Sequence, residues 1–184
     1  MLVQQRLALS FATAHVQEPL TWEMSRRFQK LMFNVLSLNV GIHEADMRLS
    51  LVGEAEDVQR AKAYLKEVGA RVRTVASGPF RGRLPESFRT HRRPHTEGER
   101  VERKLWLTVI RDQRREPFLW TLGREFDIGY KITNSATGPN MAIISLVVWG
   151  TPEELTRAVS YLRSKGIQVE LGEAGLSAPF MPLD

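Results

Sequence analysis

The first 75 residues combine two spacings of hydrophobic residues. Residues 5–11 (QRLALSF) place an apolar side chain at every second position, which is typical of a strand with one buried face. Residues 18–33 instead repeat apolar side chains three or four positions apart, as an amphipathic helix does. The remaining predicted elements are strands at 34–40 and 47–53, a helix at 56–69 and a strand at 70–75.

This pattern returns in the second half of the chain. EPLTW at 18–22 matches EPFLW at 116–120, an offset of 98 residues. Further pairs at this offset are Leu7–Leu105, Leu9–Leu107, Phe11–Val109 and Phe28–Phe126. Pairs at an offset of 97 are Gly53–Gly150, Ala61–Ala158, Tyr64–Tyr161 and Gly69–Gly166. So many ordered matches indicate duplication, with one deletion that we place between Val35 and Gly53.

The repeat predicts two domains of the order strand, helix, strand, strand, helix, strand. Right-handed crossovers make each one a four-stranded antiparallel sheet with two helices on one face. The predicted fold is therefore α+β with two ferredoxin-like domains, whose uncovered sheet faces pair within or between chains. The expected boundaries are domain 1 at 1–75, an Arg-, Pro- and Gly-rich linker at 76–103, domain 2 at 104–172 and an irregular tail at 173–184.

Composition narrows the classes of function. The 184 residues include no Cys, which excludes disulfides, cysteine zinc sites and a thiol nucleophile. No apolar run approaches the ~20 residues that a membrane span needs, and the N-terminus alternates like a strand rather than a signal peptide. We therefore expect a cytoplasmic protein.

Catalytic and metal-binding motifs are missing from the sequence. There is no HExxH, GxSxG or Cys–His arrangement, so we expect neither an enzyme nor a cofactor. His91 and His95 have a spacing of four, but Pro94 between them disfavours the helix that would bring them together. We expect no metal site.

Two repeated dipeptides are candidates for ligand binding. Glu18-Pro19 and Glu116-Pro117 stand where the first helix of each unit begins, and free backbone N–H groups there can hold a carboxylate. Glu and Pro are also common at ordinary helix starts, so this interpretation stays open.

Asparagine and tryptophan supply further candidates. Asn34 and Asn39 flank the second strand and could bind an amino-acid zwitterion, or could satisfy their own loops. Trp22 and Trp120 recur at equivalent helix positions, and we favour a role in a domain–domain contact over a pocket wall.

A family resemblance adds to this picture. EP before the first helix, Asn34-Val35-Leu36 in the second strand and YLKEVGARV at 64–72 together resemble the NIL domain, an ACT-like module named after an Asn-Ile-Leu motif. The resemblance implies a ferredoxin-like fold that binds an amino acid and pairs through its sheets, as at the C-terminus of methionine-importer ATPases. In the second unit Ile132 takes the place of Asn34, with Asn134 nearby.

The preferred hypothesis is therefore a non-enzymatic amino-acid sensor, with methionine as the candidate ligand, that forms a homodimer. Its ligand contacts would come from Glu18, Pro19, Asn34, Leu36, Asn39, Glu116, Pro117 and Asn134. The alternatives are an assembly scaffold and a nucleic-acid-binding module. The latter would use the linker arginines Arg81, Arg83, Arg89, Arg92 and Arg93.

Overall fold

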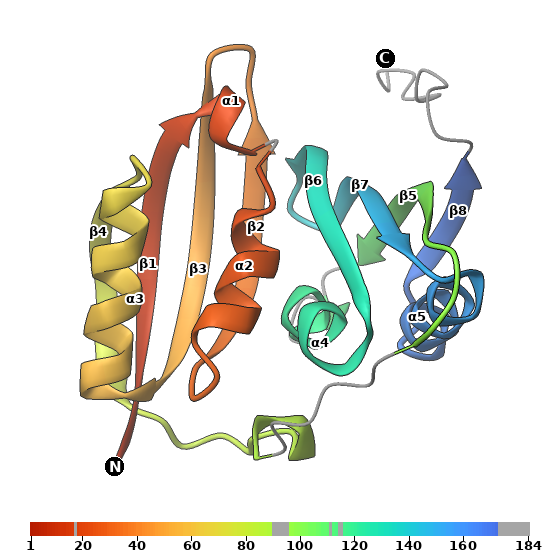
Figure 1. The fold of residues 1–184 in the computed structure, drawn as a ribbon. Coiled ribbons are helices and arrows are strands. Elements are labelled where there is room, and N and C mark those ends of the chain that lie inside the picture. Colours follow the sequence, from red (N-terminus) through yellow and green to blue (C-terminus); the bar gives the residue numbers. More distant parts are fainter. Residues whose placement is uncertain (17, 90–95, 111, 114–115, 173–184) are drawn as a thin grey trace.

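The computed structural model describes residues 1–16, 18–89, 96–110, 112–113 and 116–172 (Figure 1). The first half contains β1 (Leu2–Ala12), α1 (Thr13–Val16), α2 (Leu20–Arg27), β2 (Met32–Val40), β3 (Glu44–Glu54), α3 (Ala55–Glu67) and β4 (Arg71–Pro79). The second contains β5 (Val101–Ile110), α4 (Phe118–Glu125), β6 (Ile128–Thr137), β7 (Met141–Gly150), α5 (Pro152–Ser164) and β8 (Gln168–Gly172). A short 3-10 helix, η1 (Glu86–Phe88), lies between them.

Each half is a four-stranded antiparallel sheet, in the orders β2-β3-β1-β4 and β6-β7-β5-β8. The predicted α+β fold of two ferredoxin-like domains is confirmed. Two details differ from the expectation: α1 was not predicted, and β4 and β5 both extend into the range 76–103 expected as linker.

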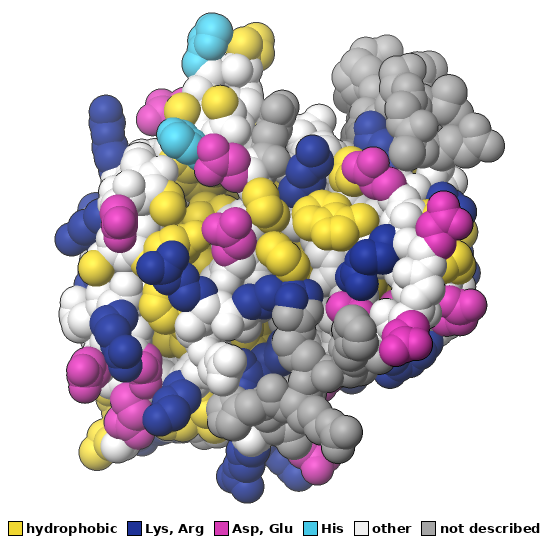
Figure 2. Space-filling model, in the orientation of Figure 1, with side chains coloured by type: hydrophobic (Ala, Val, Ile, Leu, Met, Phe, Trp, Pro, Cys, Tyr) yellow, Lys and Arg dark blue, Asp and Glu magenta, His cyan; other side chains and the backbone are white. Residues whose placement is uncertain are grey.

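The alternating residues of the central strands form the core of each half. Leu7, Leu9 and Phe11 face the helices and are almost fully buried, and their counterparts on β5 are buried in the same way. Figure 2 shows the helix-covered side, where Lys and Arg are interspersed with Asp and Glu around exposed patches of hydrophobic side chains. Among the described elements, no α-helix covers the opposite face of either sheet, so the side chains there define what can approach it.

The two sheets meet along their edges rather than through their faces. Strands β2 and β6 lie side by side, and α2 packs against α4 (Figure 1). At the helix contact, a Cβ on Gly123 would lie 2.0 Å from Ser25 Oγ, so only glycine fits there. The expectation that sheet faces pair is therefore wrong for pairing within this chain. The sheets meet at the edge strands β2 and β6, and α2 and α4, which lie on the same side of the sheets, pack against each other.

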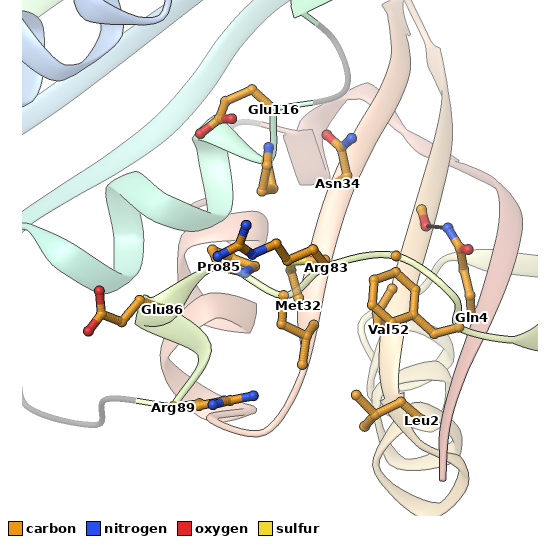
Figure 3. Close-up of a pocket in the computed structure, with 15 residues that line it drawn as sticks. Leu2, Gln4, Met32, Asn34, Val52, Arg83, Pro85, Glu86, Arg89 and Glu116 are labelled. Atoms are coloured by element: carbon orange, nitrogen blue, oxygen red, sulfur yellow. Dashed lines mark hydrogen bonds between the residues drawn. The ribbon is translucent and has the colours of Figure 1, made fainter.

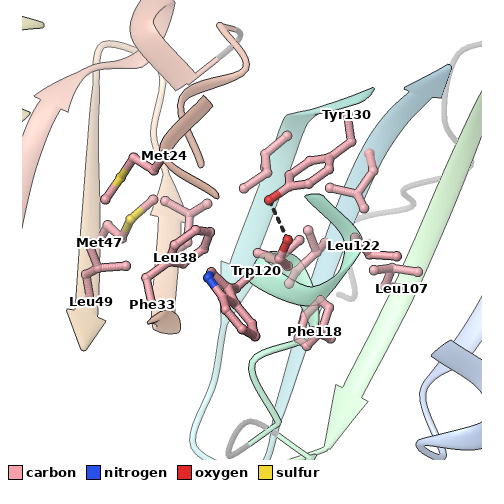
Figure 4. Close-up of a cluster of buried hydrophobic side chains, with 14 of the residues drawn as sticks. Met24, Phe33, Leu38, Met47, Leu49, Leu107, Phe118, Trp120, Leu122 and Tyr130 are labelled. Carbon is pink, nitrogen blue, oxygen red and sulfur yellow. Dashed lines mark hydrogen bonds between the residues drawn. The ribbon is translucent and has the colours of Figure 1, made fainter. Parts of the chain in front are cut away.

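The core is continuous across this junction. Phe33 and Leu38 of β2 belong to the same cluster of buried side chains as Trp120 and Tyr130 of the second half (Figure 4). Contact between the units was expected because each is small. The two halves therefore share part of their core.

Both repeated tryptophans bind the opposite half. Trp22 Nε1 donates to the Ile128 carbonyl at 2.8 Å, and Trp120 Nε1 donates to the Leu31 carbonyl at 2.9 Å. The two bonds are related by the repeat, since each joins the first long helix of one half to the beginning of the edge strand of the other. They support the predicted role of these residues in a domain contact.

The strand register corrects the position of the deletion. The pairing of β2 with β3 shifts between Val35 and Ser37, and the pairing of β6 with β7 shifts between Ile132 and Asn134, an offset of 97. The offset is already 97 at the beginning of the edge strands, so the deletion lies in the turn between α2 and β2. The repeat counterpart of Asn34 is therefore Lys131 and not Ile132.

Candidate functional site

A groove of about 1340 Å³ lies over the uncovered face of the first sheet (Figure 3). We call it the linker groove. Side chains of β1, β2 and β3 form its floor, the segment 80–89 crosses it, and the residue pair before α4 closes one end. The lining residues are Leu2, Gln4, Met32, Asn34, Ser50, Val52, Phe80, Gly82, Arg83, Leu84, Pro85, Glu86, Arg89, Glu116 and Pro117.

Arg124 of α4 holds the linker in this position. Its Nε donates to the Ser87 carbonyl at 2.9 Å, and a terminal nitrogen donates to the Phe88 carbonyl at 3.1 Å. The ring of Phe88 packs against Trp120, with centroids 6.4 Å apart. Burial lowers the pKa of Arg124. Part of the linker therefore packs on the second half, as its length suggested.

The groove combines both charges with apolar surface. Arg83 and Arg89 are exposed cations of the linker, while Glu86 and Glu116 supply carboxylates. Met32 and Val52 add apolar floor at one end. Such a surface can hold a small zwitterion that also carries an apolar side chain.

Glu116 is positioned by two neighbours from α5 and its end. The Tyr161 hydroxyl donates to Glu116 Oε1 at 2.8 Å, and Lys165 Nζ lies 3.8 Å from the same oxygen. Burial, reinforced by Glu116, raises the pKa of Tyr161, so this hydroxyl remains a donor. Tyr161 and Lys165 thus fix the position of one carboxylate oxygen of Glu116, Oε1.

The structure brings together some of the predicted residues and separates others. Asn34, Glu116 and Pro117 all line the linker groove, together with Arg83 and Arg89. Leu36 is half-buried at the irregularity of β2, outside the groove.

The remaining asparagines have local or junction partners. Asn39 Oδ1 accepts from the Thr137 backbone N–H at 2.8 Å, across the junction of β2 and β6. Asn134 Oδ1 accepts from the Ser135 backbone N–H at 2.9 Å, within its own strand. Both amide oxygens therefore accept from backbone groups, and that of Asn39 does so across the junction and not within its own loop.

The beginnings of α2 and α4 leave little room for a ligand. The space between Glu18, Leu20 and Ile132 of the opposite half has a volume of about 10 Å³, enough for one water at most. The corresponding space between Pro117 and Val35 has a volume near 0 Å³. An amino acid at Glu18-Pro19 or directly on the start of α4 would first have to displace these side chains.

The comparisons with known proteins agree with the repeat. The family model for the NIL domain matches residues 5–74 and again 104–171. The chain belongs to the NIL domain family. This is a family of regulatory domains, and both halves of the chain are members of it. A comparison with curated proteins gives no match.

Solved structures similar to this NIL pair are distant. Aminoacylhistidine dipeptidase from Vibrio alginolyticus is 10% identical with a TM-score of 0.35, over 93% of this chain and 39% of that one. An unknown protein from Galdieria sulphuraria is 10% identical with a TM-score of 0.31, over 95% and 99%. A putative glycine cleavage system transcriptional repressor is 10% identical with a TM-score of 0.28, over 94% and 97%.

The structure describes only some of the residues that were candidates for binding nucleic acid or a metal ion. Arg81 is exposed outside the groove, whereas Arg92, Arg93, His91 and His95 lie outside the described residues. Within the described ranges, no three His, Asp or Glu side chains gather as metal ligands, and no helix is long and apolar enough to cross a membrane.

Several groove residues were missed by the sequence reasoning. Gln4 and Ser50 face the groove and bond to each other, Gln4 Nε2 to Ser50 Oγ at 2.9 Å. Both stand at the polar positions of alternating strands, so the period of two could have identified them. The crossing of the linker over this face had no signal in the sequence.

Proposed function

We propose that this NIL pair is a non-enzymatic sensor that binds a small amino acid with an apolar side chain, such as methionine, in the linker groove. The observation that carries the proposal is the grouping of Arg83, Glu116 and Asn34 beside the apolar floor at Met32 and Val52. An arginine suits the ligand carboxylate, a carboxylate and an amide oxygen suit its ammonium group, and the apolar floor suits its side chain.

Binding in this groove would be coupled to the domain junction. The groove takes its floor from the first half and its end wall from α4 of the second, while Arg124 ties the linker between them. A ligand that contacts all three parts stabilises the arrangement in which they are close. In our proposal this change alters the pairing of two copies of the chain.

Thermal unfolding with and without L-methionine tests the proposal. A ligand at one hundred times its Kd stabilises the folded state by about 2.7 kcal/mol, which raises the Tm of a chain of this size by roughly 5–10 °C. Arg83→Gln is expected to reduce this shift strongly. Arg81→Gln is the matched control, because it removes the same charge from the same linker outside the groove.

Two outcomes would count against the proposal. One is no stabilisation by any amino acid at millimolar concentration, and the other is an equal loss in Arg81→Gln and Arg83→Gln. Light scattering after size-exclusion chromatography tests the pairing separately, since a ligand that binds without changing the molar mass leaves the sensor role without a signal.

A further inference from the structure

A second hollow lies on the same uncovered sheet face, at the end away from the linker groove. Its volume is about 570 Å³, and Arg48 of β3 faces Arg71 and Arg73 of β4 across it. Ser10, Ser37 and Asn39 contribute polar lining, and Asp46 is the one carboxylate among the described lining residues. We call it the arginine hollow.

The strand register explains why a hollow forms. Ala8 of β1 is paired with Arg48 on one side and with Arg73 on the other. Because neighbouring strands are ~4.8 Å apart, the two arginine Cα atoms are separated by roughly 10 Å across a small methyl group. Arg71 and Arg73 are two residues apart on one strand, and hence about 7 Å.

The hollow is a property of this half and not of the fold. In the second sheet Trp106 takes the place of Ala8, paired with Ser145 and Glu170 where the first sheet has Arg48 and Arg73. The indole covers Gly172, where an added Cβ would lie 1.9 Å from the ring. The equivalent position is therefore filled and carries no cationic cluster.

The charge of the arginine hollow is only partly balanced by its described lining, where the carboxylate of Asp46 stands against Arg48, Arg71 and Arg73. Among the described residues, no ion pair involves Arg48, Arg71 or Arg73, and Arg6 on the same face also has none. On the helix-covered side, by contrast, cations are interspersed with carboxylates (Figure 2). Three cations against one carboxylate leave a net positive charge and a mutual repulsion, which a bound anion removes.

We propose that the arginine hollow binds a small ligand that carries two or more phosphate groups. Guanidinium groups suit phosphate because their planar N–H groups bind two oxygens at once. Separations of about 7 and 10 Å between arginine Cα atoms let one ligand engage several guanidinium groups. No described lining residue is aromatic, and without base stacking a single-stranded nucleic acid is a poorer fit than a compact polyphosphate. The site is separate from the linker groove and does not depend on the proposed amino-acid sensing.

Isothermal titration calorimetry with sodium tripolyphosphate on the full chain tests the proposal at fixed ionic strength. Arg48→Gln and Arg73→Gln are each expected to raise the Kd at least tenfold, because each removes charge-assisted hydrogen bonds. Arg60→Gln removes the same charge from the exposed surface of α3 and is expected to change the Kd less than twofold. Ala8→Trp copies the second sheet and is expected to abolish binding by filling the hollow.

The remaining titrations separate the alternatives. Orthophosphate is expected to bind at least tenfold more weakly than tripolyphosphate, and a thymidine oligonucleotide more weakly per phosphate. Arg83→Gln is expected to change the Kd for tripolyphosphate by less than twofold, because Arg83 lies in the linker groove. This variant therefore distinguishes a failure of the phosphate site from a failure of the amino-acid site. Circular dichroism confirms that each variant is folded. No tripolyphosphate binding, an equal effect of Arg60→Gln, equal affinity for orthophosphate, or preference for the oligonucleotide would each overturn the proposal.

Discussion

The uncovered faces of the two sheets differ much more than their helix-covered faces. In the first half this face carries arginines around Ala8, and in the second it carries Trp106 at the same place. The covered faces keep matching apolar residues, such as Leu7 and its counterpart Leu105. A duplicated domain has thus kept its packing while the chemistry of its free surface changed, so ligand chemistry has to be argued separately for each half.

At the junction, the two halves make the same tryptophan hydrogen bonds, but the two tryptophans differ in burial. Trp22 and Trp120 make equivalent hydrogen bonds to the opposite half. Trp120 is 0% exposed, whereas Trp22 is only half-buried. The linker contributes to this difference, because Arg124 holds it over α4, where the ring of Phe88 packs against Trp120.

The largest expected effect is the difference in stability lost when each of these two tryptophans is removed. Trp120→Ala is expected to lower the free energy of unfolding by about 4 kcal/mol, because it removes a fully buried ring and leaves the Leu31 carbonyl without its donor. Trp22→Ala is expected to cost about half as much, since part of its ring already contacts water. Urea denaturation measures both values.

Trp120→Phe is the matched control for this pair. It keeps most of the packing and removes the indole N–H, so a loss of about 1 kcal/mol is expected. Equal losses in Trp22→Ala and Trp120→Ala would contradict the argument, because the linker would then add nothing to the burial of the second site.

Much of the fold could be predicted because it depends on local periodicity and on repetition. Leu7, Leu9 and Phe11 alternate as strand residues do, and their recurrence at Leu105 and Leu107 revealed the second domain. These signals concern which face of an element is buried, and they do not depend on how the two halves meet.

What could not be predicted depends on contacts between distant segments. The deletion was misplaced because sequence matches stop at Phe28 and resume only at Gly53, and only strand pairing locates the shift between them. The edge-to-edge junction was missed because it depends on Gly123 meeting Ser25 across the halves. Likewise, Asn34 and Glu116 were candidates for different reasons, and only the crossing linker places them in one groove.

The second prediction concerns the pH dependence of stability, which depends on a buried carboxylate before β6 that has no counterpart before β2. In the turn before β6, Asp127 accepts hydrogen bonds from the Thr96 backbone N–H and hydroxyl and from Arg100, whereas the turn before β2 holds Gln29 and Lys30. Burial alone would raise the pKa of Asp127, but the bonds from Arg100 and Thr96 outweigh it and lower the pKa to about 2.

The sign of the pH dependence follows from this lowered pKa. The folded protein favours the ionised carboxylate, so the stabilisation is fully present above the ordinary pKa near 4 and is lost as the pH falls toward 2. At ~1.4 kcal/mol per pKa unit the loss amounts to about 2 kcal/mol. Asp127→Asn should lose this amount at pH 7 and show a weaker pH dependence below pH 4, measured by urea denaturation. A Glu67→Gln variant at the exposed end of α3 is the control, and an identical acid response in both variants would refute the assignment.

The smallest expected effect makes the two halves more alike. Thr151 caps α5 by accepting from the Glu154 backbone N–H, whereas Glu54, at the same place before α3, makes no such bond. Glu54 contacts the N-terminal amine at 3.2 Å, but both groups are exposed and such pairs contribute little. Glu54→Thr is therefore expected to add about 0.5 kcal/mol and to raise the Tm by roughly 1–2 °C, while Thr151→Ala lowers it by more. A lower Tm in Glu54→Thr would mean that the amine contact, and not the missing cap, distinguishes the beginning of α3 from that of α5.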